Sequence, residues 1–192
     1  MKFGTSGIRE IYSEKITGDI IKLGNSISRL GVKSVFIAND TRKSCSLIAD
    51  YLGASISMNG IDVELGGELP TPVIAFVLKK REFDLGVSST ASHNPPEFCG
   101  VKLFDENGIA LDVDVEKKIE ENLNAESLGS GDFDYGNISY DCNARDDYFE
   151  DIFSHVGEQK KKFRMVVDCA NGVGSDFTPR LLGEMGLSLI HI

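Results

Sequence analysis

The chain has 192 residues, of which 41% are hydrophobic and 26% are charged, a composition typical of a globular protein with one domain and part of a second. Its formal net charge of -10 disfavours nucleic acids and anionic membrane surfaces as partners, because both repel an acidic protein. The sequence contains no apolar run that could cross a bilayer and no apolar signal segment at its N-terminus, so we expect a cytoplasmic protein.

Helical patterns alternate with short apolar strands through the first half of the chain. Strands joined in this way through helices are expected to lie parallel in one α/β sheet, with right-handed crossovers. In chain order, we expect a helix from the cap Thr17 to Gly31, a strand over 35–38, a helix from the cap Ser44 to Gly60, a strand over 61–65 that Gly66-Gly67 ends, a helix starting at Thr71 and Pro72, and a strand over 83–88.

The pattern changes after residue 90. Asn107-Gly108 lies between apolar runs at 101–104 and 109–111 and predicts a hairpin, which would add an antiparallel edge to the parallel sheet. Further along, we expect a helix over 114–123, a loop over 124–143 and a closing helix over 146–156.

A polar and basic stretch at 157–162 marks a domain boundary. A single β-α-β unit follows it, and such a unit cannot bury both faces of its sheet. We therefore expect a three-layer α/β/α domain with a mostly parallel mixed sheet over 1–157, and the truncated beginning of a second similar domain over 158–192. The elements expected in this second part are a strand from 164, a turn over 171–175, a helix over 179–185 and a strand over 187–192.

The four cysteines are widely separated and form no CxxC pair, which argues against a zinc site and against a disulfide framework. Reduced cysteines fit the cytoplasm. We expect Cys99 to be a small buried apolar side chain, although it lies near the stretch described next.

The most informative stretch is Thr90–Pro95, which reads Thr-Ala-Ser-His-Asn-Pro and follows the strand over 83–88. Ser92 supplies a nucleophilic hydroxyl, and Lys102 follows where a hairpin can return its ammonium group to that hydroxyl. A phosphoserine carries about two negative charges and needs such a cation. His93 can act as an acid, a phosphate ligand or an ordinary loop histidine, and we favour a supporting electrostatic role. The alternative is a turn in which these residues have only backbone roles.

Polar groups also follow other strand ends, where α/β sheets bind ligands. Thr5, Ser6 and Arg9 offer hydroxyls and a guanidinium suited to phosphate, or they belong to a flexible terminal turn. Asp40 and Arg42 are either an ion pair without function or a support for the site.

These segments together resemble the α-D-phosphohexomutase family, which includes phosphoglucomutases and phosphomannomutases. The resemblance covers the whole chain, and its motifs come in matching order, which makes it far more specific than a single motif. The motifs are the opening Phe3–Arg9, the turn Asp40–Arg42, the segment Gly67–Pro72, the serine loop Thr90–Pro95 followed by Gly100-Val101-Lys102, and Val166–Gly172 at the start of a second domain.

The resemblance implies a four-domain, Mg2+-dependent enzyme that interconverts hexose 1-phosphate and hexose 6-phosphate, of mannose or glucose. A phosphoserine and a hexose 1,6-bisphosphate, as intermediate and activator, carry the phosphoryl group. Positioning and charge neutralisation dominate such chemistry. In this sequence the resemblance makes Ser92 the phosphoryl carrier and, through its phosphate, a metal ligand. It implies that Arg9, His93 and Lys102 are catalytic together with Ser92. The residues that it implies for phosphate binding are Thr5, Ser6, Arg9, His93, Asn94 and Lys102.

The chain also departs from the family pattern. It contains no DGDxDR-type loop, which would supply the three metal-binding aspartates, and the loops that select the sugar and bind its phosphate belong to the third and fourth domains of the family. We therefore expect this chain to need domains II–IV as partners and to be inactive alone. The departures in supporting positions are Glu10 for Gly, Asn39 for Arg, Ser89 for an apolar residue, and Phe98-Cys99-Gly100 for Tyr-Asn-Gly.

The residue before Ala91 bears on the choice of sugar. Thr90 favours the phosphomannomutase/phosphoglucomutase group, because phosphoglucosamine mutases often carry Ser at this position. A phosphoglucosamine mutase remains an alternative. So does a non-catalytic domain that binds a sugar phosphate or a partner chain.

Overall fold

A mixed sheet forms the centre of the protein in the computed structural model, which describes residues 2–4, 7–123, 135–156 and 164–190. In the described part the sheet has six strands in the order β1-β5-β4-β2-β3-β6. β2, β3, β4 and β6 are parallel, whereas β5 is antiparallel to both of its neighbours, β4 and β1. The strands are β1 (Ile8–Ile11), β2 (Ser34–Asn39), β3 (Asp62–Glu68), β4 (Leu85–Ser89), β5 (Phe98–Asp105) and β6 (Ile138–Tyr140).

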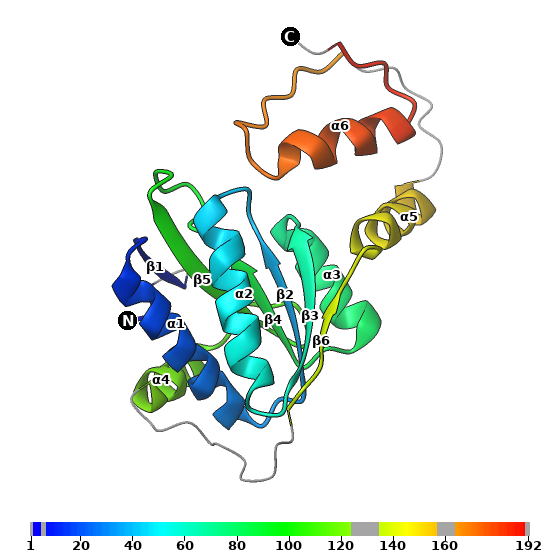
Figure 1. Ribbon diagram of the computed structural model, residues 1–192. Helices are drawn as coiled ribbons and strands as arrows, with labels where there is room; N and C mark the ends of the chain where they lie inside the picture. Colours follow the sequence, from blue (N-terminus) through cyan, green and yellow to red (C-terminus); the bar gives the residue numbers. More distant parts are fainter. Residues whose placement is uncertain (1, 5–6, 124–134, 157–163, 191–192) are drawn as a thin grey trace.

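Helices cover both faces of this sheet, so the expected three-layer α/β/α architecture is confirmed (Figure 1). α1, α2 and α4 lie on one face, and α3 and α5 lie on the other. The helices are α1 (Glu14–Ile27) with the short 3-10 turn η1 (Ser28–Leu30), α2 (Lys43–Ser57), α3 (Thr71–Arg81), α4 (Val113–Asn122), α5 (Ala144–Val156) and α6 (Gly174–Glu184). Among the helices described, none combines the length and apolarity needed to cross a membrane.

The alternation of side chains along β2 explains why both faces are apolar. Val35 and Ile37 pack under α1 and α2, whereas Phe36 and Ala38 pack under α3 and α5. All four side chains are fully buried. A central parallel strand that is apolar on both sides can only be stable between two layers of helices.

Several boundaries differ from those that the sequence predicts, and β1 and β6 fall where it predicts no strand. β6 is a short exposed strand of three residues, too brief for an alternating pattern to be detected. β3 continues through Gly66-Gly67 instead of ending there. Gly66 faces the ring of Phe36, where a side chain would not fit, and Gly67 has a φ of 67° at an irregularity in the pairing with β2. These glycines therefore shape the strand rather than break it.

Helix starts also shift, because the capping residues that the sequence suggests are not the ones used. α1 begins at Glu14, after Ser13, and not after Thr17. α2 follows Arg42, and α3 follows Pro70 with Thr71 already helical. The turn at Asn107-Gly108 is present, with Gly108 at a φ of 75°, but residue 110 makes only an isolated bridge to Phe104.

The C-terminal part, residues 164–190, is a single helix between two extended segments. Of the strands expected here, neither forms in the described residues, because no neighbouring strand pairs with them: Val166 is 99% exposed and Ile190 is 88% exposed. α6 begins five residues earlier than expected, and Pro179 lies inside it. The boundary at 157–162 and most of the loop over 124–143 lie outside the described residues.

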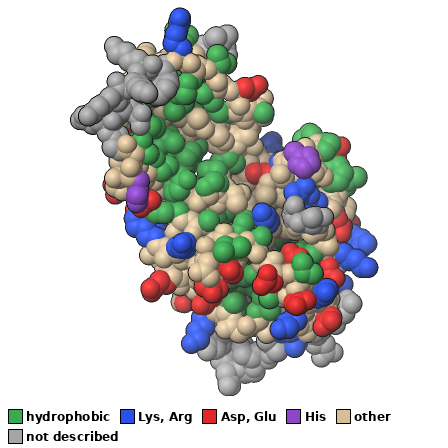
Figure 2. All heavy atoms as spheres, turned by 180° about the vertical axis from the view of Figure 1, so that it is seen from behind, with side chains coloured by type: hydrophobic (Ala, Val, Ile, Leu, Met, Phe, Trp, Pro, Cys, Tyr) green, Lys and Arg blue, Asp and Glu red, His purple; other side chains and the backbone are tan. Residues whose placement is uncertain are grey.

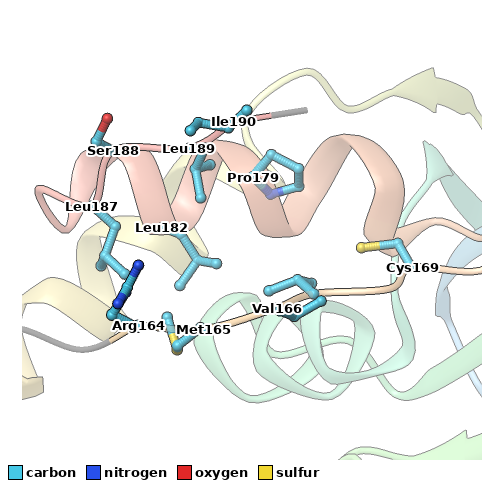
Figure 3. A pocket seen from close by; sticks show the side chains of 11 residues that line it. Arg164, Met165, Val166, Cys169, Pro179, Leu182, Leu187, Ser188, Leu189 and Ile190 are labelled. Atoms are coloured by element: carbon cyan, nitrogen blue, oxygen red, sulfur yellow. The ribbon is translucent and has the colours of Figure 1, made fainter. Parts of the chain in front are cut away.

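α6 contacts the first part of the chain through aromatic rings. The ring of Phe177 packs against Phe149 of α5 at 4.6 Å and against Tyr148 at 5.9 Å. On its other side, α6 and the extended segments enclose an open apolar groove of about 540 Å³, into which Leu182 and Leu187 point (Figure 3). Seen from behind, the hydrophobic side chains gather at this upper part of the molecule, whereas charged ones dominate the lower part (Figure 2).

Candidate active site

Ser92 lies in a loop at the carboxyl end of β4, as the sequence predicts. β2 and β4 are neighbours and end together, and the backbone N–H of Asp40, just after β2, donates to the carbonyl of Ser89 at 3.0 Å. Ser92 is exposed and has a φ of 56°. This left-handed conformation costs a non-glycine residue about 1–2 kcal/mol. The surrounding structure must therefore hold the serine in place.

An arginine from the preceding turn supplies part of that restraint. The guanidinium of Arg42 donates to a carboxylate oxygen of Asp40, to the carbonyl of Ser92 at 3.0 Å and to the carbonyl of Asn94 at 2.7 Å. Its side chain is only 18% exposed. One arginine thus bridges the turn after β2 and two backbone groups of the serine loop, which are about 50 residues away in sequence.

Thr90 completes the restraint from the side of β4. Its hydroxyl donates to a carboxylate oxygen of Asp40 at 2.7 Å and accepts the backbone N–H of Ser92 at 2.9 Å. Asp40 is therefore shared between Thr90 and Arg42. Of the two possibilities left open for Asp40 and Arg42, these contacts favour a support for the site, since both groups contact the serine loop. Sequence reasoning did not place Arg42 among the site residues; the Asp-Thr-Arg triplet directly after a buried strand was the available signal.

His93 lies beside the serine, but its proximity alone does not define a site. Its Nδ1 is 3.5 Å from the Oγ of Ser92, and both side chains are exposed. A second Ser-His pair, Ser154 and His155 on α5, is closer, at 3.1 Å. Ser154 is an ordinary helical residue whose hydroxyl bonds to the carbonyl of Asp151. What distinguishes Ser92 is the restrained loop and not the neighbouring imidazole.

Arg9 reaches the serine loop from the edge of the sheet. β1 pairs Arg9 with Gly100 of β5, and the guanidinium donates to the side-chain oxygen of Asn94 at 3.4 Å. A β-carbon at Gly100 would collide with the carbonyl oxygens of Ile8 and Thr90. The missing side chain thus lets β1, β5 and the loop approach closely, and it brings two predicted phosphate-binding residues, Arg9 and Asn94, together.

Lys102 lies on the same strand but has a different contact. It pairs with Ser88 of β4, two residues beyond Gly100, and therefore shares a sheet face with Gly100 and Arg9. Its ammonium lies 5.0 Å from the centre of the Phe104 ring, a cation–π contact. The structure therefore does not bring Lys102 onto Ser92 by a described contact, and its role stays a prediction. Thr5 and Ser6 lie outside the described residues.

Three of the residues that depart from the family pattern, Asn39, Ser89 and Cys99, are buried. Asn39 donates to the carbonyl of Asp40 at 2.8 Å, and the hydroxyl of Ser89 donates to the carbonyl of Cys45 at 2.7 Å. Cys99 is fully buried, as expected, and burial raises the pKa of its thiol to about 11. Burial and the negative charge of Asp40 raise the pKa of Cys45 to about 12. Both thiols stay protonated and are unsuited to nucleophilic chemistry at neutral pH.

No cluster of three or more His, Cys, Asp or Glu side chains that could hold a metal ion occurs among the described residues. Asp40, the carboxylate next to the serine loop, is already bonded to Arg42 and Thr90. The donor set around Ser92 is consequently cationic or hydroxylic, which suits a phosphate group better than a bare cation.

The fold and this serine loop define a known class of sugar-phosphate enzyme domain. Residues 1–130 match the family model described as phosphoglucomutase/phosphomannomutase, alpha/beta/alpha domain I. The chain belongs to this family. The match covers more than half of its residues and includes the serine loop.

Several curated relatives carry the name phosphoglucosamine mutase. One from Methanococcus maripaludis is 38% identical over 191 residues, which are 99% of this chain and 41% of the relative. The one from Methanococcus vannielii is 37% identical over 191 residues, which are 99% of this chain and 42% of the relative. The chain thus spans about two fifths of the length of the relatives that it matches.

Solved structures agree with the fold. A phosphoglucomutase/phosphomannomutase family protein from Burkholderia thailandensis superposes with a TM-score of 0.79 at 25% identity, covering 99% of this chain and 43% of that one. A protein from Thermus thermophilus superposes with a TM-score of 0.82 at 27% identity, covering 98% of this chain and 44% of that one. The N-terminal position of the match, as expected from the motifs, is confirmed.

Proposed function

We propose that this chain supplies the phosphoryl-carrying serine of a hexose-phosphate mutase, with Ser92 as the carrier. The observation that carries the proposal is the restrained, exposed hydroxyl of Ser92 at the end of β4, held at a φ of 56° by Arg42 and Thr90. A phosphoryl carrier needs a hydroxyl that a sugar can approach, on a support that does not move during transfer.

In the proposed reaction, the bond between phosphorus and the Oγ of Ser92 breaks while a sugar hydroxyl oxygen forms its own bond to phosphorus. The sugar bisphosphate then turns and returns its other phosphoryl group to the Oγ. Arg9, His93 and Lys102 would neutralise the transferred charge, and Lys102 would help to move the proton that leaves the attacking sugar hydroxyl and returns to the sugar oxygen in the second transfer. Asn94, Thr5 and Ser6 would bind phosphate oxygens. Oriented cations and N–H groups are the main source of rate in such transfers.

Mg2+ is part of the proposal only through the phosphorylated form of Ser92. A phosphate on Ser92 would give the ion one oxygen ligand, and Mg2+ prefers such oxygens. When bound, the ion would neutralise charge on the phosphoryl group. The carboxylate of Asp40 is engaged by Arg42 and Thr90, so the other ligands would come from outside this chain.

The sugar is the finer part of the proposal. Thr90 favours mannose or glucose, whereas the names of the archaeal relatives support glucosamine phosphate. We give more weight to the relatives, because they match over 99% of this chain, whereas Thr90 is one position. Hexose 1,6-bisphosphate would serve as activator for either sugar.

We further propose that 1–157 is the carrier domain and that 158–192 is the beginning of a second domain. Exposure of Val166 and Ile190 supports this division, because these apolar side chains lack the cover that β2 and β4 receive from helices. A chain without the other domains is expected to carry phosphate but not to turn over hexose phosphate in a coupled mutase assay. Turnover by the purified chain would contradict this expectation.

Intact-mass spectrometry tests the carrier role directly. The chain is incubated with Mg2+ and glucose 1,6-bisphosphate, and a phosphate-sized mass increment is expected. Ser92→Ala should abolish the increment. Ser154→Ala is the matched control, because Ser154 also lies next to an exposed histidine, and it should leave the increment unchanged. No increment in the native chain would favour a non-catalytic sugar-phosphate-binding or interaction domain.

A further inference from the structure

We propose that Arg42 is the positioning residue of the phosphoryl-carrying loop, acting together with Asp40 and Thr90. The inference rests on the proposed function, since it assigns the residues that hold Ser92 ready for transfer. The guanidinium of Arg42 makes no described contact with the Oγ of Ser92. Arg42 acts instead through the backbone on both sides of His93.

The contacts of the guanidinium account for this role. Nη2 donates to two carbonyl groups, those of Ser92 and Asn94, which fixes the direction of the Ser92–His93 and Asn94–Pro95 peptide planes. Nη1 donates to Asp40, which in turn accepts the hydroxyl of Thr90. A planar guanidinium can satisfy three acceptors in fixed directions, whereas a lysine ammonium at the end of a flexible stem cannot.

The orientation of Asp40 is itself fixed by the backbone. Its Oδ1 accepts the N–H of Arg42 at 2.9 Å, and its own N–H donates to Ser89 at the end of β4. The chain of contacts therefore runs from the sheet to Asp40, from Asp40 to Arg42 and Thr90, and from these to Ser92. Each link is a direct hydrogen bond between described atoms.

The same contacts argue against a role on the reacting group. Both Nη atoms of Arg42 are engaged by Asp40 and by the loop carbonyls, and its Nε is buried without a hydrogen-bond partner among the described residues. The guanidinium therefore faces the backbone of the loop. Arg9, by contrast, contacts the loop through the Asn94 side chain alone among the described residues, which leaves its other N–H groups to a phosphate.

Hydrogen exchange and phosphorylation kinetics together test the inference on the intact 192-residue chain. In Arg42→Lys and in Thr90→Val, backbone N–H exchange in the Ala91–Asn94 segment should be at least about tenfold faster than in the native chain. The initial rate of Ser92 phosphorylation by glucose 1,6-bisphosphate should fall about 100-fold in Arg42→Lys, with little change in the KM for the bisphosphate. Thr90→Ser, which keeps the hydroxyl, should restore both readouts.

Arg81→Lys is the matched control. Arg81 also bridges three acceptors, Glu64, Asp141 and Asp147, and its side chain is 24% exposed, but it has no described contact with the serine loop. This variant should lower stability without changing loop exchange or the phosphorylation rate.

Two results would overturn the inference. One is a backbone N–H exchange rate in the loop that equals the rate of the native chain in both Arg42→Lys and Thr90→Val. The other is an equal effect of Arg81→Lys on the loop, which would show a general loss of stability. If the native chain acquires no phosphate, the proposed carrier role fails in this chain, and the exchange measurements alone still decide whether Arg42 holds the loop.

Discussion

The two parts of this chain share a β-α-β sequence pattern but reach different structures. In the first part, apolar runs such as Val35–Ala38 become strands that pair on both sides and are covered by helices. In the second part, the similar run Met165–Val167 stays extended, unpaired in the described residues and exposed. An apolar run therefore becomes a buried strand only when neighbouring strands satisfy its backbone and helices cover its side chains.

The serine loop belongs entirely to the first part, and residues of that part hold it. Its restraints come from the turn after β2, from β4 and from β5, all of which lie inside the completed sheet. Between described residues, the second part makes one long hydrogen bond to this region, from the hydroxyl of Thr41 to the carbonyl of Asn171 at 3.4 Å. The serine loop should therefore keep its shape when the second part is altered.

The largest expected difference between the two parts is in core substitutions. Phe36→Ala should lower the free energy of unfolding by about 3–5 kcal/mol, because the ring is fully buried beside Phe83 and Gly66. Val166→Ala should change it by less than about 0.5 kcal/mol, because this side chain is 99% exposed. Urea denaturation measures both. Equal effects would mean that the second part has a packed core as well.

The second largest difference is expected between the reactivity of the buried cysteines and that of the more exposed cysteines. Cys45 and Cys99 are fully buried, with the pKa of each thiol raised by burial, whereas Cys142 is exposed and Cys169 is half-buried. At pH 8, iodoacetamide should label Cys142 and Cys169 at least about 100-fold faster than the buried pair, since only thiolates react. Peptide mass spectrometry measures the labelling.

The raised pKa values of Cys45 and Cys99 also predict how the stability of the fold depends on pH. Below about pH 9 the buried thiols are protonated in both the folded and the unfolded chain, so they leave stability unchanged. Above the ordinary value of 9.0 the unfolded thiols ionise while the folded ones do not until about pH 11 to 12. Stability should therefore fall as pH rises through this window, and the fall should be smaller in Cys45→Ala and Cys99→Ala.

A glycine in each part gives opposite expectations for the same substitution. Gly100→Ala should destabilise by about 1–3 kcal/mol, because the new methyl group would meet the carbonyls of Ile8 and Thr90. Gly183→Ala lies in α6 with open space around it and should stabilise by about 0.5–1 kcal/mol. Thermal unfolding of the two variants measures both signs. A stabilising Gly100→Ala would contradict the close approach of β1 to the serine loop.

The smallest effect on stability is expected at the packing contact between α6 and α5. Phe177→Leu keeps an apolar side chain but removes the edge-to-face contact with Phe149, and should cost about 0.5–1.5 kcal/mol. Phe76→Leu, which removes a comparable contact with Tyr148 inside the first part, is the reference. No change in Phe177→Leu alone would show that α6 adds nothing to the stability of the first part.

Much of the fold could be predicted because strong periodic signals coincide with buried elements. The strands at 34–39 and 85–89 and the helices that cover them follow from such signals. β1 and β6 could not be predicted, since a short edge strand has too few buried positions to show alternation. The strands expected at 164–167 and 187–192 were wrong for the described residues, because local β-propensity cannot supply a partner strand.

Residues that are adjacent in the chain were enough to identify the family, the order of its motifs and the serine of the TASHNP loop, because each motif is a short run of sequence. The tertiary structure was needed to show that Arg42 and Thr90 hold this loop, that Arg9 reaches Asn94, and that Lys102 lies over Phe104. These contacts depend on the sheet order β1-β5-β4-β2. Sheet order brings together residues that are tens of positions apart, and no local pattern in the sequence records it.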